Sequence, residues 1–327
     1  MQRALVTGAS GFIGSALCRR LLSDGVAVRA LCRSVGKGRA LAEAGAEIVV
    51  GDVQDTASVE RHSAGCDVVF HVAARGSGSA ALQYAVNVQG TLNVIQAARK
   101  GSALRYVHVS TVAVYGYNVD GPIDESHLHC PSRYDFYMQS KSIGETRAWE
   151  YARRTGLPMV AVRPAFVYGP GSTVWSRAMY ELCRRYPVPQ IDGGHGHAHP
   201  IHVDDVVDLL VAVATHPDAP GHAFHAAPDP APTLREYLGY YAEMAGNTRQ
   251  IVIPARPLKP LAVAATVVSR LTGRPMDFAG MLCYVTHHPT YRMTRAAEVL
   301  GWRPRVSLAE GMTRTEPWLK GLDNKQS

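Results

Sequence analysis

Two residues in the stretch 133–145 have the types and the spacing of an acid/base pair. Tyr137 and Lys141 are four residues apart, so on a helix their side chains lie one above the other on a single face. A tyrosine with the usual pKa of about 10 is a poor base at neutral pH, but a nearby ammonium group favours the phenolate and lowers that pKa. Such a pair could give or take the proton of a substrate hydroxyl. The spacing also arises by chance on helix surfaces, so other parts of the sequence must support this interpretation.

A glycine-rich segment near the N-terminus has the composition of a phosphate-binding turn. In "LVTGASGFIG", Gly8, Gly11 and Gly14 follow the first predicted strand and open a helix, with the spacing GxxGxxG. Backbone N–H groups and the positive helix end would then face a pyrophosphate, and a Cβ at these positions would obstruct its approach. An ordinary glycine-rich turn is the alternative, but the position directly after the first strand favours a dinucleotide site.

The end of the second predicted strand bears on the choice of dinucleotide. An acidic residue there would bind the ribose hydroxyls of NAD, but "VRALCRSVGK" contains none. Arg33, together with Lys37, could instead pair with the 2′-phosphate of NADP. The alternative is a solvated arginine, so the sequence favours NADP and leaves NAD possible. After the third strand, Asp52 could accept a hydrogen bond from the adenine amino group, and Val53 could contact the ring.

The composition indicates a compact α/β enzyme. The chain has 327 residues, of which 46% are hydrophobic and 19% charged, and this balance argues against disorder. The net charge is +7, but the arginines are scattered and no basic run is interleaved with aromatic residues, so we do not expect nucleic-acid binding. The six cysteines form no CxxC pair, and neither a secretory signal nor a membrane-spanning run is apparent. We therefore expect a cytoplasmic protein with reduced cysteines and no stable membrane insertion.

The order of apolar patterns predicts the architecture. Strand-length apolar runs alternate with helical patterns as far as about residue 170, which indicates a Rossmann-type, doubly wound parallel sheet. We expect residues 1–170 to form the dinucleotide-binding domain, with a further strand and helix near 200–226 returning to it. Residues 171–327 would mainly form a smaller substrate-binding cap over the carboxyl end of the sheet.

Several motifs, read together, resemble the extended short-chain dehydrogenase/reductase family, of the NAD-dependent epimerase/dehydratase type. They are "TGASGFIG", "GDVQD", "VFHVAA", "NVQGTLNVIQAA", "VSTVAVYG", "YMQSK", "VRPAFVYGPG" and "IHVDDVVD". The resemblance implies that Thr111, next to Ser110, is catalytic together with Tyr137 and Lys141, whereas Tyr134 is a packing or pocket residue. The residues expected to bind the cofactor are Gly8, Ser10, Gly11, Phe12, Ile13, Gly14, Arg33, Lys37, Asp52, Val53, Ala73, Ala74, Asn87, Tyr137, Lys141, Pro164 and Val167.

Two departures from the family pattern indicate the branch. Nucleotide-sugar enzymes of the family usually have Asn in RxxNxYGP and Arg before the "IHVDD"-like motif, where this chain has Phe166 and Ala198. The tail is similar to that of the 3β-hydroxysteroid dehydrogenase-like branch, which includes dihydroflavonol-type and β-keto-acid reductases. The resemblance implies an NAD(P)-dependent oxidoreductase acting on a secondary alcohol or ketone of a bulky apolar substrate. The alternatives are a nucleotide-sugar epimerase or dehydratase, and a catalytically silent dinucleotide sensor.

Other segments have weaker signals. His195, His197, His199 and His202 could hold a metal, but flanking Gly and Pro favour a mobile loop over the substrate, and we expect no metal. The stretch 74–83 falls where the family contacts nicotinamide and substrate. The apolar helix near 260–271 could wall the pocket or lie on a membrane surface, although packing against the core is favoured. By family resemblance, helices at 87–100 and 137–154 would pair across a homodimer axis.

Overall fold

The centre of the molecule is a parallel sheet of seven strands. The computed structural model describes residues 1–272 and 276–323. The strand order is β11 (Ala223–Ala226), β7 (Met159–Pro164), β5 (Arg105–Val109), β4 (Val68–His71), β1 (Arg3–Thr7), β2 (Ala27–Cys32) and β3 (Glu47–Val50). Every neighbouring pair in this sheet is parallel. The predicted doubly wound α/β fold is confirmed.

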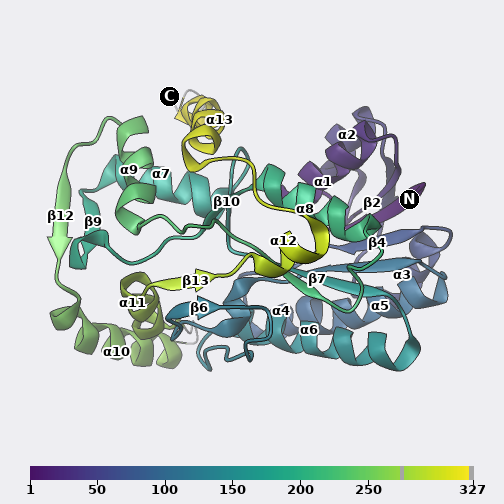
Figure 1. The fold of residues 1–327 in the computed structure, drawn as a ribbon, viewed down its shortest axis with the longest axis horizontal. Coiled ribbons are helices and arrows are strands. Elements are labelled where there is room, and N and C mark those ends of the chain that lie inside the picture. The colour runs from purple at the N-terminus through teal and green to yellow at the C-terminus, as the bar shows by residue number, and fades with distance from the viewer. Residues whose placement is uncertain (273–275, 324–327) are drawn as a thin grey trace.

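Helices cover both faces of the sheet, which explains why its strands are so apolar. On one face lie α1 (Phe12–Ser23), α2 (Val35–Glu43) and α8 (Val203–Thr215), and on the other α3 (Thr56–Ser63), α5 (Thr91–Lys100) and α6 (Phe136–Thr155) (Figure 1). Leu17 and Leu210 are fully buried in the first layer, and Ile95 and Ala148 in the second. The two layers fix the strand ends on which the site is built.

The strand order reverses next to β1. From β1 the chain runs outward through β2 and β3, and it then returns to β4, β5, β7 and β11 on the opposite side. Open α/β sheets bind ligands in the crevice outside the carboxyl ends of the strands at such a reversal. The turn after β1 and the loop after β4 meet at this crevice.

The residues after β7, together with β6 from before it, build a second layer of small elements over that edge. Short parallel pairs join β8 (Phe166–Tyr168) to β10 (Pro200–His202), β9 (Val188–Ile191) to β12 (Gln250–Ile253), and β6 (Gly121–Ile123) to β13 (Pro289–Tyr291). The helices of this part are α7 (Ala178–Arg185), α9 (Leu234–Met244), α10 (Ala255–Leu271), α11 (Phe278–Thr286), α12 (Thr294–Leu300) and α13 (Leu308–Asp323). A separate apolar cluster that includes Tyr237, Tyr241 and Leu319 holds α7, α9 and α13 together.

Two short helical segments lie beside helix α6. After α4 (Ala80–Tyr84), residues Ala85–Gly90 form a π-helical turn that leads into α5, where the sequence predicted one continuous helix. Gly144 of α6 lies so close to this turn that a Cβ there would be 2.1 Å from the Asn87 carbonyl oxygen. The close approach explains the glycine in the middle of a 20-residue helix.

Among the described residues, no helix combines the length and the apolar character needed to cross a bilayer.

Candidate active site

The turn between β1 and α1 forms a cradle of backbone groups. Gly8 has φ +66°, and a Cβ on it would lie 2.7 Å from the backbone of Ala73 at the end of β4. A Cβ on Gly14 would lie 2.2 Å from the Gly8 carbonyl oxygen. The helix begins at Gly11 with no side-chain cap, so its first N–H groups face outward with the positive helix end. These features fit a pyrophosphate, which supports a dinucleotide at this turn.

A cleft of about 370 Å³ continues from the cradle to the ends of β2 and β3. Of the residues expected at the cofactor, those that line it are Gly8, Ser10, Gly11, Phe12, Ile13, Gly14, Arg33, Asp52, Val53, Ala73 and Ala74. Arg75 also lines it, and the sequence analysis did not single that residue out. Lys37 is exposed on α2 and is not part of the lining.

Asn87 does not line the cleft but holds in place the loop that does. Its amide nitrogen donates to the Arg75 carbonyl and to the Ser140 hydroxyl, both at 2.9 Å, and its amide oxygen accepts from the Arg75 N–H at 2.8 Å. The side chain is 1% exposed. Asn87 therefore ties the loop after β4 to helix α6.

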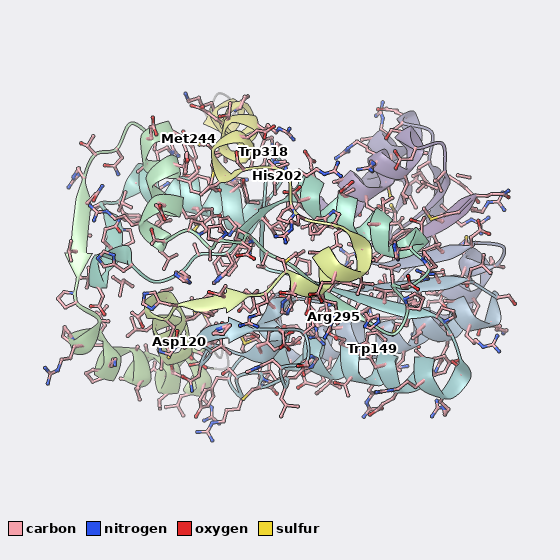
Figure 2. The ribbon with its side chains drawn as sticks, viewed as in Figure 1. Asp120, Trp149, His202, Met244, Arg295 and Trp318 are labelled. Carbon is pink, nitrogen blue, oxygen red and sulfur yellow. The ribbon has the colours of Figure 1, made fainter. Side chains whose placement is uncertain are left out.

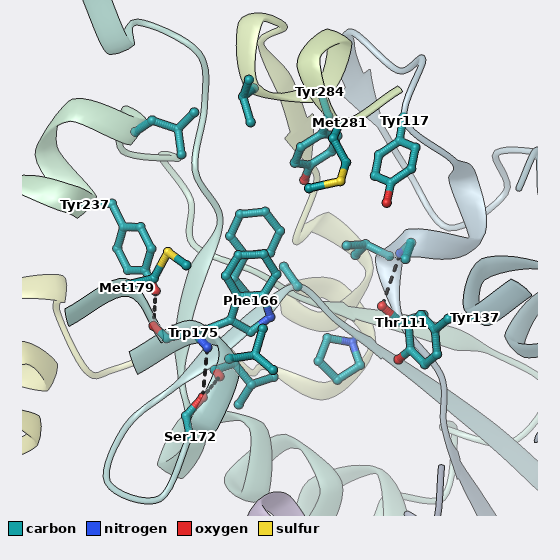
Figure 3. A pocket seen from close by; sticks show the side chains of 18 of the residues that line it. Thr111, Tyr117, Tyr137, Phe166, Ser172, Trp175, Met179, Tyr237, Met281 and Tyr284 are labelled. Carbon is teal, nitrogen blue, oxygen red and sulfur yellow. Dashed lines mark hydrogen bonds between the residues drawn. The ribbon is translucent and has the colours of Figure 1, made fainter. Parts of the chain in front are cut away.

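Helix α6 and the end of β5 bring Thr111 and Tyr137 together. Asp135 caps α6 by accepting the N–H of Met138 at 3.0 Å, which fixes where the helix begins. Thr111 starts a short 3₁₀ turn (Val112–Tyr115), where its hydroxyl accepts the N–H of Ala113 at 3.2 Å. The Thr111 hydroxyl also lies near the Tyr137 phenol and acts to lower its pKa. Figure 3 shows the two oxygens facing each other at one end of the cavity.

The pKa of Tyr137 departs from the sequence-based expectation. Burial raises the pKa of this phenol to about 12, and the charge of Asp135 adds to the rise while the Thr111 hydrogen bond opposes it. The expected lowering by Lys141 is not seen, because the Lys141 ammonium group is not among the groups that act on the phenol. In this structure Tyr137 is a protonated donor at neutral pH, as a general acid must be.

Lys141 lies one turn beyond Tyr137 on helix α6. Its Nζ donates to the Val109 carbonyl oxygen at 2.6 Å, and the residue is 2% exposed. Burial lowers the pKa of Lys141 to about 8, while the nearby Glu145 carboxylate opposes the shift. The lysine is therefore mostly protonated at neutral pH, and the nearby carboxylate favours that charged form.

Glu145 continues the face of α6 that carries Tyr137 and Lys141, and sequence reasoning missed it. Its carboxylate accepts from Arg163 Nη2 at 2.6 Å, from Ser110 Oγ at 2.5 Å and from Trp149 Nε1 at 3.1 Å. The Arg163 guanidinium outweighs burial and lowers the pKa of Glu145 to about 2. The i, i+4, i+8 spacing of Tyr137, Lys141 and Glu145 was the sequence signal that could have identified Glu145. Because Ser110 donates its hydroxyl to Glu145, Thr111 is the hydroxyl left facing the phenol.

The buried ionic network extends across the sheet. Arg163 Nη1 also donates to the Tyr115 hydroxyl, which lies 2.7 Å from His225 Nε2. Arg295 Nη1, from α12, lies 3.8 Å from the Glu125 carboxylate on the far side. Figure 2 labels Trp149 and Arg295, which mark the two ends of this network. Glu145 connects this network to Lys141, whose charged form it favours.

A cavity of about 740 Å³ extends from Thr111 and Tyr137 into the cap. Its walls are largely aromatic and aliphatic, and the expected cofactor contacts Pro164 and Val167 lie at its base. The rings of Phe166 and Trp175 stack with centroids 3.8 Å apart and planes at 7° (Figure 3). Trp175 had no distinguishing signal in the sequence. No Lys, Arg or His is among the described residues that line this cavity.

Most of the histidine-rich stretch lies outside regular helices and strands, as its composition predicted, but contacts with distant residues anchor its histidines. His199 is fully buried, with Nε2 2.9 Å from the Pro289 carbonyl and Nδ1 3.1 Å from the Tyr284 hydroxyl. His202 ends β10 and caps α8. None of the four histidines is among the described residues that line the cavity, and no group of three His, Cys, Asp or Glu in the described chain could hold a metal. Contacts with β13, distant in sequence, order this stretch.

Tyr134 also lies outside the cavity lining. The guanidinium groups of Arg133 and Arg270 lie 4.8 and 4.9 Å from the centre of its ring. The ring therefore packs the start of α6 against α10, in agreement with a packing residue.

A model of the NAD dependent epimerase/dehydratase family matches residues 4–227. The chain belongs to this family. Members of the epimerase/dehydratase family use NAD. In this chain the backbone cradle at Gly8, Gly11 and Gly14 fits such a dinucleotide.

Individual relatives fall on both branches of the family. The chain is 33% identical, over 256 residues, to the 4-hydroxy-2-methyl-3-oxo-4-farnesyl-3,4-dihydroquinoline-1-oxide ketoreductase of Stigmatella aurantiaca, covering 76% of this chain and 75% of the relative. It is 31% identical, over 333 residues, to the 2-alkyl-3-oxoalkanoate reductase of Stenotrophomonas maltophilia (strain K279a). This match covers 95% of this chain and 98% of the relative. The structure of the dTDP-glucose 4,6-dehydratase of Streptomyces venezuelae, solved with NAD bound, superposes on this chain with a TM-score of 0.76 at 25% identity. The match covers 99% of this chain and 98% of the dehydratase.

Proposed function

We propose that the protein is an NAD(P)-dependent oxidoreductase that interconverts a ketone and a secondary alcohol on a bulky apolar substrate, steroid-, flavonoid- or β-keto-acid-like. The observation that carries the proposal is the cavity of about 740 Å³ that ends on Tyr137 and Thr111. Sites of this size hold drug-sized molecules, and apolar walls with a few polar groups fix their orientation. The two ketone reductases among the relatives support the same reaction class.

The residues divide the reaction between them. When bound, the nicotinamide would transfer the hydride to or from the carbon that carries the oxygen. Tyr137 would give its phenolic proton to the carbonyl oxygen during reduction, so that the alcohol leaves with one hydride and one proton gained. Thr111 would hydrogen-bond the same oxygen and stabilise its developing charge. Lys141 would hold the nicotinamide ribose, and Asn87 would keep the loop after β4 in place.

The charges of the cavity further favour an uncharged substrate. Asp135 is the one charged residue among the described lining residues, and its carboxylate already accepts from Met138 N and the Tyr117 hydroxyl. A diphosphate or a free carboxylate would enter without a cation to pair with, which is costly away from water. We therefore place neutral ketones ahead of free β-keto acids within the proposed class.

A nucleotide-sugar epimerase or dehydratase remains the second candidate because the dehydratase from Streptomyces venezuelae shares the fold over nearly the whole chain. Phe166, stacked on Trp175, stands at the usual Asn position, and the buried Ala198 replaces the usual Arg. Neither can bind a diphosphate. A silent dinucleotide sensor is disfavoured because Thr111, Tyr137 and Lys141 are all present.

We also propose the following division of the chain and its assembly. Residues 1–170, with the strand and helix near 200–226, would bind the cofactor, for which NADP is favoured through Arg33. Residues 171–327 would form most of the substrate cap. The protein would be a cytoplasmic homodimer paired through α5 and α6, and light scattering that returned a 35.3 kDa particle at micromolar concentration would refute the pairing.

The test is oxidation of NADPH by the purified protein, with a panel of neutral steroid and flavonoid ketones, a β-keto acid and UDP-glucose. We expect turnover with at least one bulky neutral ketone, weaker turnover with the acid, and none with UDP-glucose. Epimerisation of UDP-glucose would establish the second candidate instead. Tight NADPH binding without turnover of any carbonyl compound would support the sensor.

A further inference from the structure

Helix α10 presents an apolar face to solvent. Leu261, Val263, Val267, Val268 and Leu271 are each at least half exposed, and Leu271 reaches 83%. At 3.6 residues per turn these five positions fall within an arc of about 160° on one side of the helix. Single exposed apolar residues are ordinary, but a contiguous apolar helix face usually marks an interaction surface.

The opposite side of α10 is fixed to the rest of the molecule. Thr266 is 4% exposed, and its hydroxyl accepts the N–H of Ala279 in α11 at 3.1 Å. Ala255 is buried at the first turn, and its N–H donates to Asp192 Oδ1 at 2.7 Å. Figure 1 shows α10 at the outer edge of the molecule, beside α11. The inner face therefore packs on α11 and on the loop at Asp192, not on the main core, and the outer face is a fixed surface.

The charged residues of α10 itself are all positive, although Asp192 lies beside its first turn. Arg256, Lys259 and Arg270 are exposed on the helix, and from residue 244 to residue 276 the sequence contains no Asp or Glu. Asp277, the next acid, is 9% exposed and accepts hydrogen bonds from Ser132 Oγ and Gly280 N. Lys259 and Arg270 border the apolar arc at helical spacing. Long cationic side chains at such a border can reach past the apolar face toward anionic groups.

We propose that α10 is an interfacial helix that rests on an anionic lipid surface. Its apolar side chains would enter the headgroup boundary, and Arg256, Lys259 and Arg270 would pair with anionic headgroups. The helix would lie in the membrane plane and not cross it, because its 17 residues form no membrane span. The net charge of +7 acts in the same direction at longer range.

A second copy of the chain fits this surface less well than lipid does. Two-fold pairing of α10 with itself would bring two sets of Arg256, Lys259 and Arg270 together, and no acid between residues 244 and 276 could meet them. Like charges placed opposite each other across an interface oppose association. Anionic headgroups have the complementary charge. The lipid-facing surface would also lie one helix away from the cavity, which α11 lines with Met281 and Tyr284.

The test is flotation of the full-length protein with lipid vesicles. We expect binding to vesicles of phosphatidylcholine with about 30% phosphatidylglycerol, weaker binding to phosphatidylcholine alone, and weakening by salt. The double substitution Leu261→Ser and Leu271→Ser should lower the association constant at least about tenfold. The matched control substitutes Leu104 and Leu128, which are also exposed but lie outside α10, by Ser and should bind like the wild type. Thermal melting verifies that both variants are folded.

Three results would overturn the proposal: no binding of the wild type to anionic vesicles, equal binding of the two double variants, or conversion of an oligomer to a monomer by the α10 substitutions in lipid-free sedimentation. The third result would make α10 a self-association face. The lipid-binding proposal does not depend on the proposed enzymatic reaction. If one of the two proposals is refuted, the other is unaffected.

Discussion

Tyr137 is the residue whose protonation the site controls most directly. Because burial raises its pKa to about 12, the phenol has a proton to give at neutral pH. Tyr137→Phe removes that proton and keeps the ring, so we expect turnover to fall at least about a hundredfold, the scale of a positioned acid/base group. Cofactor affinity, measured by fluorescence titration, should change little.

Tyr134→Phe is the matched control for that substitution. Tyr134 lies one turn earlier, between Arg133 and Arg270 and outside the cavity lining, so the variant should keep wild-type turnover. Near-wild-type turnover of Tyr137→Phe, or equal losses in the two variants, would remove Tyr137 from the chemistry.

Arg33 carries the prediction about cofactor choice. It lines the cleft at the end of β2, where a guanidinium can form two charge-assisted hydrogen bonds to a 2′-phosphate. Arg33→Ala should weaken NADP(H) binding by about 1–3 kcal/mol, or roughly ten- to a hundredfold, and leave NAD(H) nearly unchanged. Dissociation constants of both cofactors for wild type and variant test this.

Arg39→Ala controls for the loss of a positive charge on the same side of the molecule. Arg39 is exposed on α2 and pairs with Glu43, so its removal should affect neither cofactor. Equal losses of NADP(H) and NAD(H) on substitution of Arg33 would mean that it serves the fold or the shared adenosine. A wild type that prefers NAD(H) would contradict the NADP prediction itself.

Residue types and spacing could locate the pieces of the site that are local in sequence. Gly8 and Gly14 follow the first strand, and Tyr137 and Lys141 share a helix face. The Glu145–Arg163 pair was not found, because its partners belong to α6 and β7 and meet only when that helix packs on that strand. The raised pKa of Tyr137 was missed for a related reason, since burial depends on the whole surrounding structure.

At the scale of elements, the contact between α6 and the π-helical turn at 85–90 is tight enough to test. Gly144→Ala would place a Cβ 2.1 Å from the Asn87 carbonyl oxygen, so the helix must shift. We expect a loss of about 1–3 kcal/mol in the free energy of unfolding, as for other overpacked positions. The shift should also lower cofactor affinity, because Asn87 holds the loop that lines the cleft.

Gly239→Ala provides the comparison within the same chain. Gly239 lies inside α9, and a Cβ there would meet nothing within 4 Å. Alanine has the higher helix propensity, so this variant should gain about 0.5–1 kcal/mol. Chemical denaturation of both variants measures the two effects. If the two substitutions changed stability in the same direction, the proposed close contact would not control the packing of α6.

Periodicity predicted most elements well because strand and helix patterns depend on neighbouring residues. The β/α alternation up to β7 is confirmed by the parallel sheet. The contacts of the histidine-rich stretch were not predicted, because its Gly, Pro and His composition indicates only a loop. In the molecule, β10 pairs with β8, and His199 contacts Pro289, 90 residues later. Such contacts leave no periodic signal in the sequence.

The whole molecule keeps several histidines neutral in its interior, and this should limit its acid stability. Burial lowers the pKa of His71 and His225 to about 3 and that of His199 to about 4. Unfolded, each would titrate near pH 6.5, so between about pH 6.5 and 4 the unfolded chain binds more protons. Stability therefore falls as the pH falls, by up to about 1.4 kcal/mol per pH unit for each histidine.

The measurement is the free energy of unfolding between pH 7 and pH 4, by urea denaturation. His71→Gln should reduce the slope of that free energy with pH by about one proton. His222→Gln, at an exposed position, is the matched control for the loss of a histidine. A wild-type stability that is flat between pH 6.5 and 4.5 would show that these histidines do not control acid unfolding.

The stacked pair Phe166 and Trp175 gives the cavity an intrinsic optical reporter. The chain has four tryptophans, and of these only Trp175 is among the described residues that line the cavity. Its indole lies flat on Phe166, so a ligand that contacts or parts the two rings must change the surroundings of this fluorophore. Ligand binding should therefore shift or quench tryptophan emission, and Trp175→Phe should abolish that change while the other three tryptophans still emit. Candidate substrates could be screened by fluorescence before any reaction product is identified.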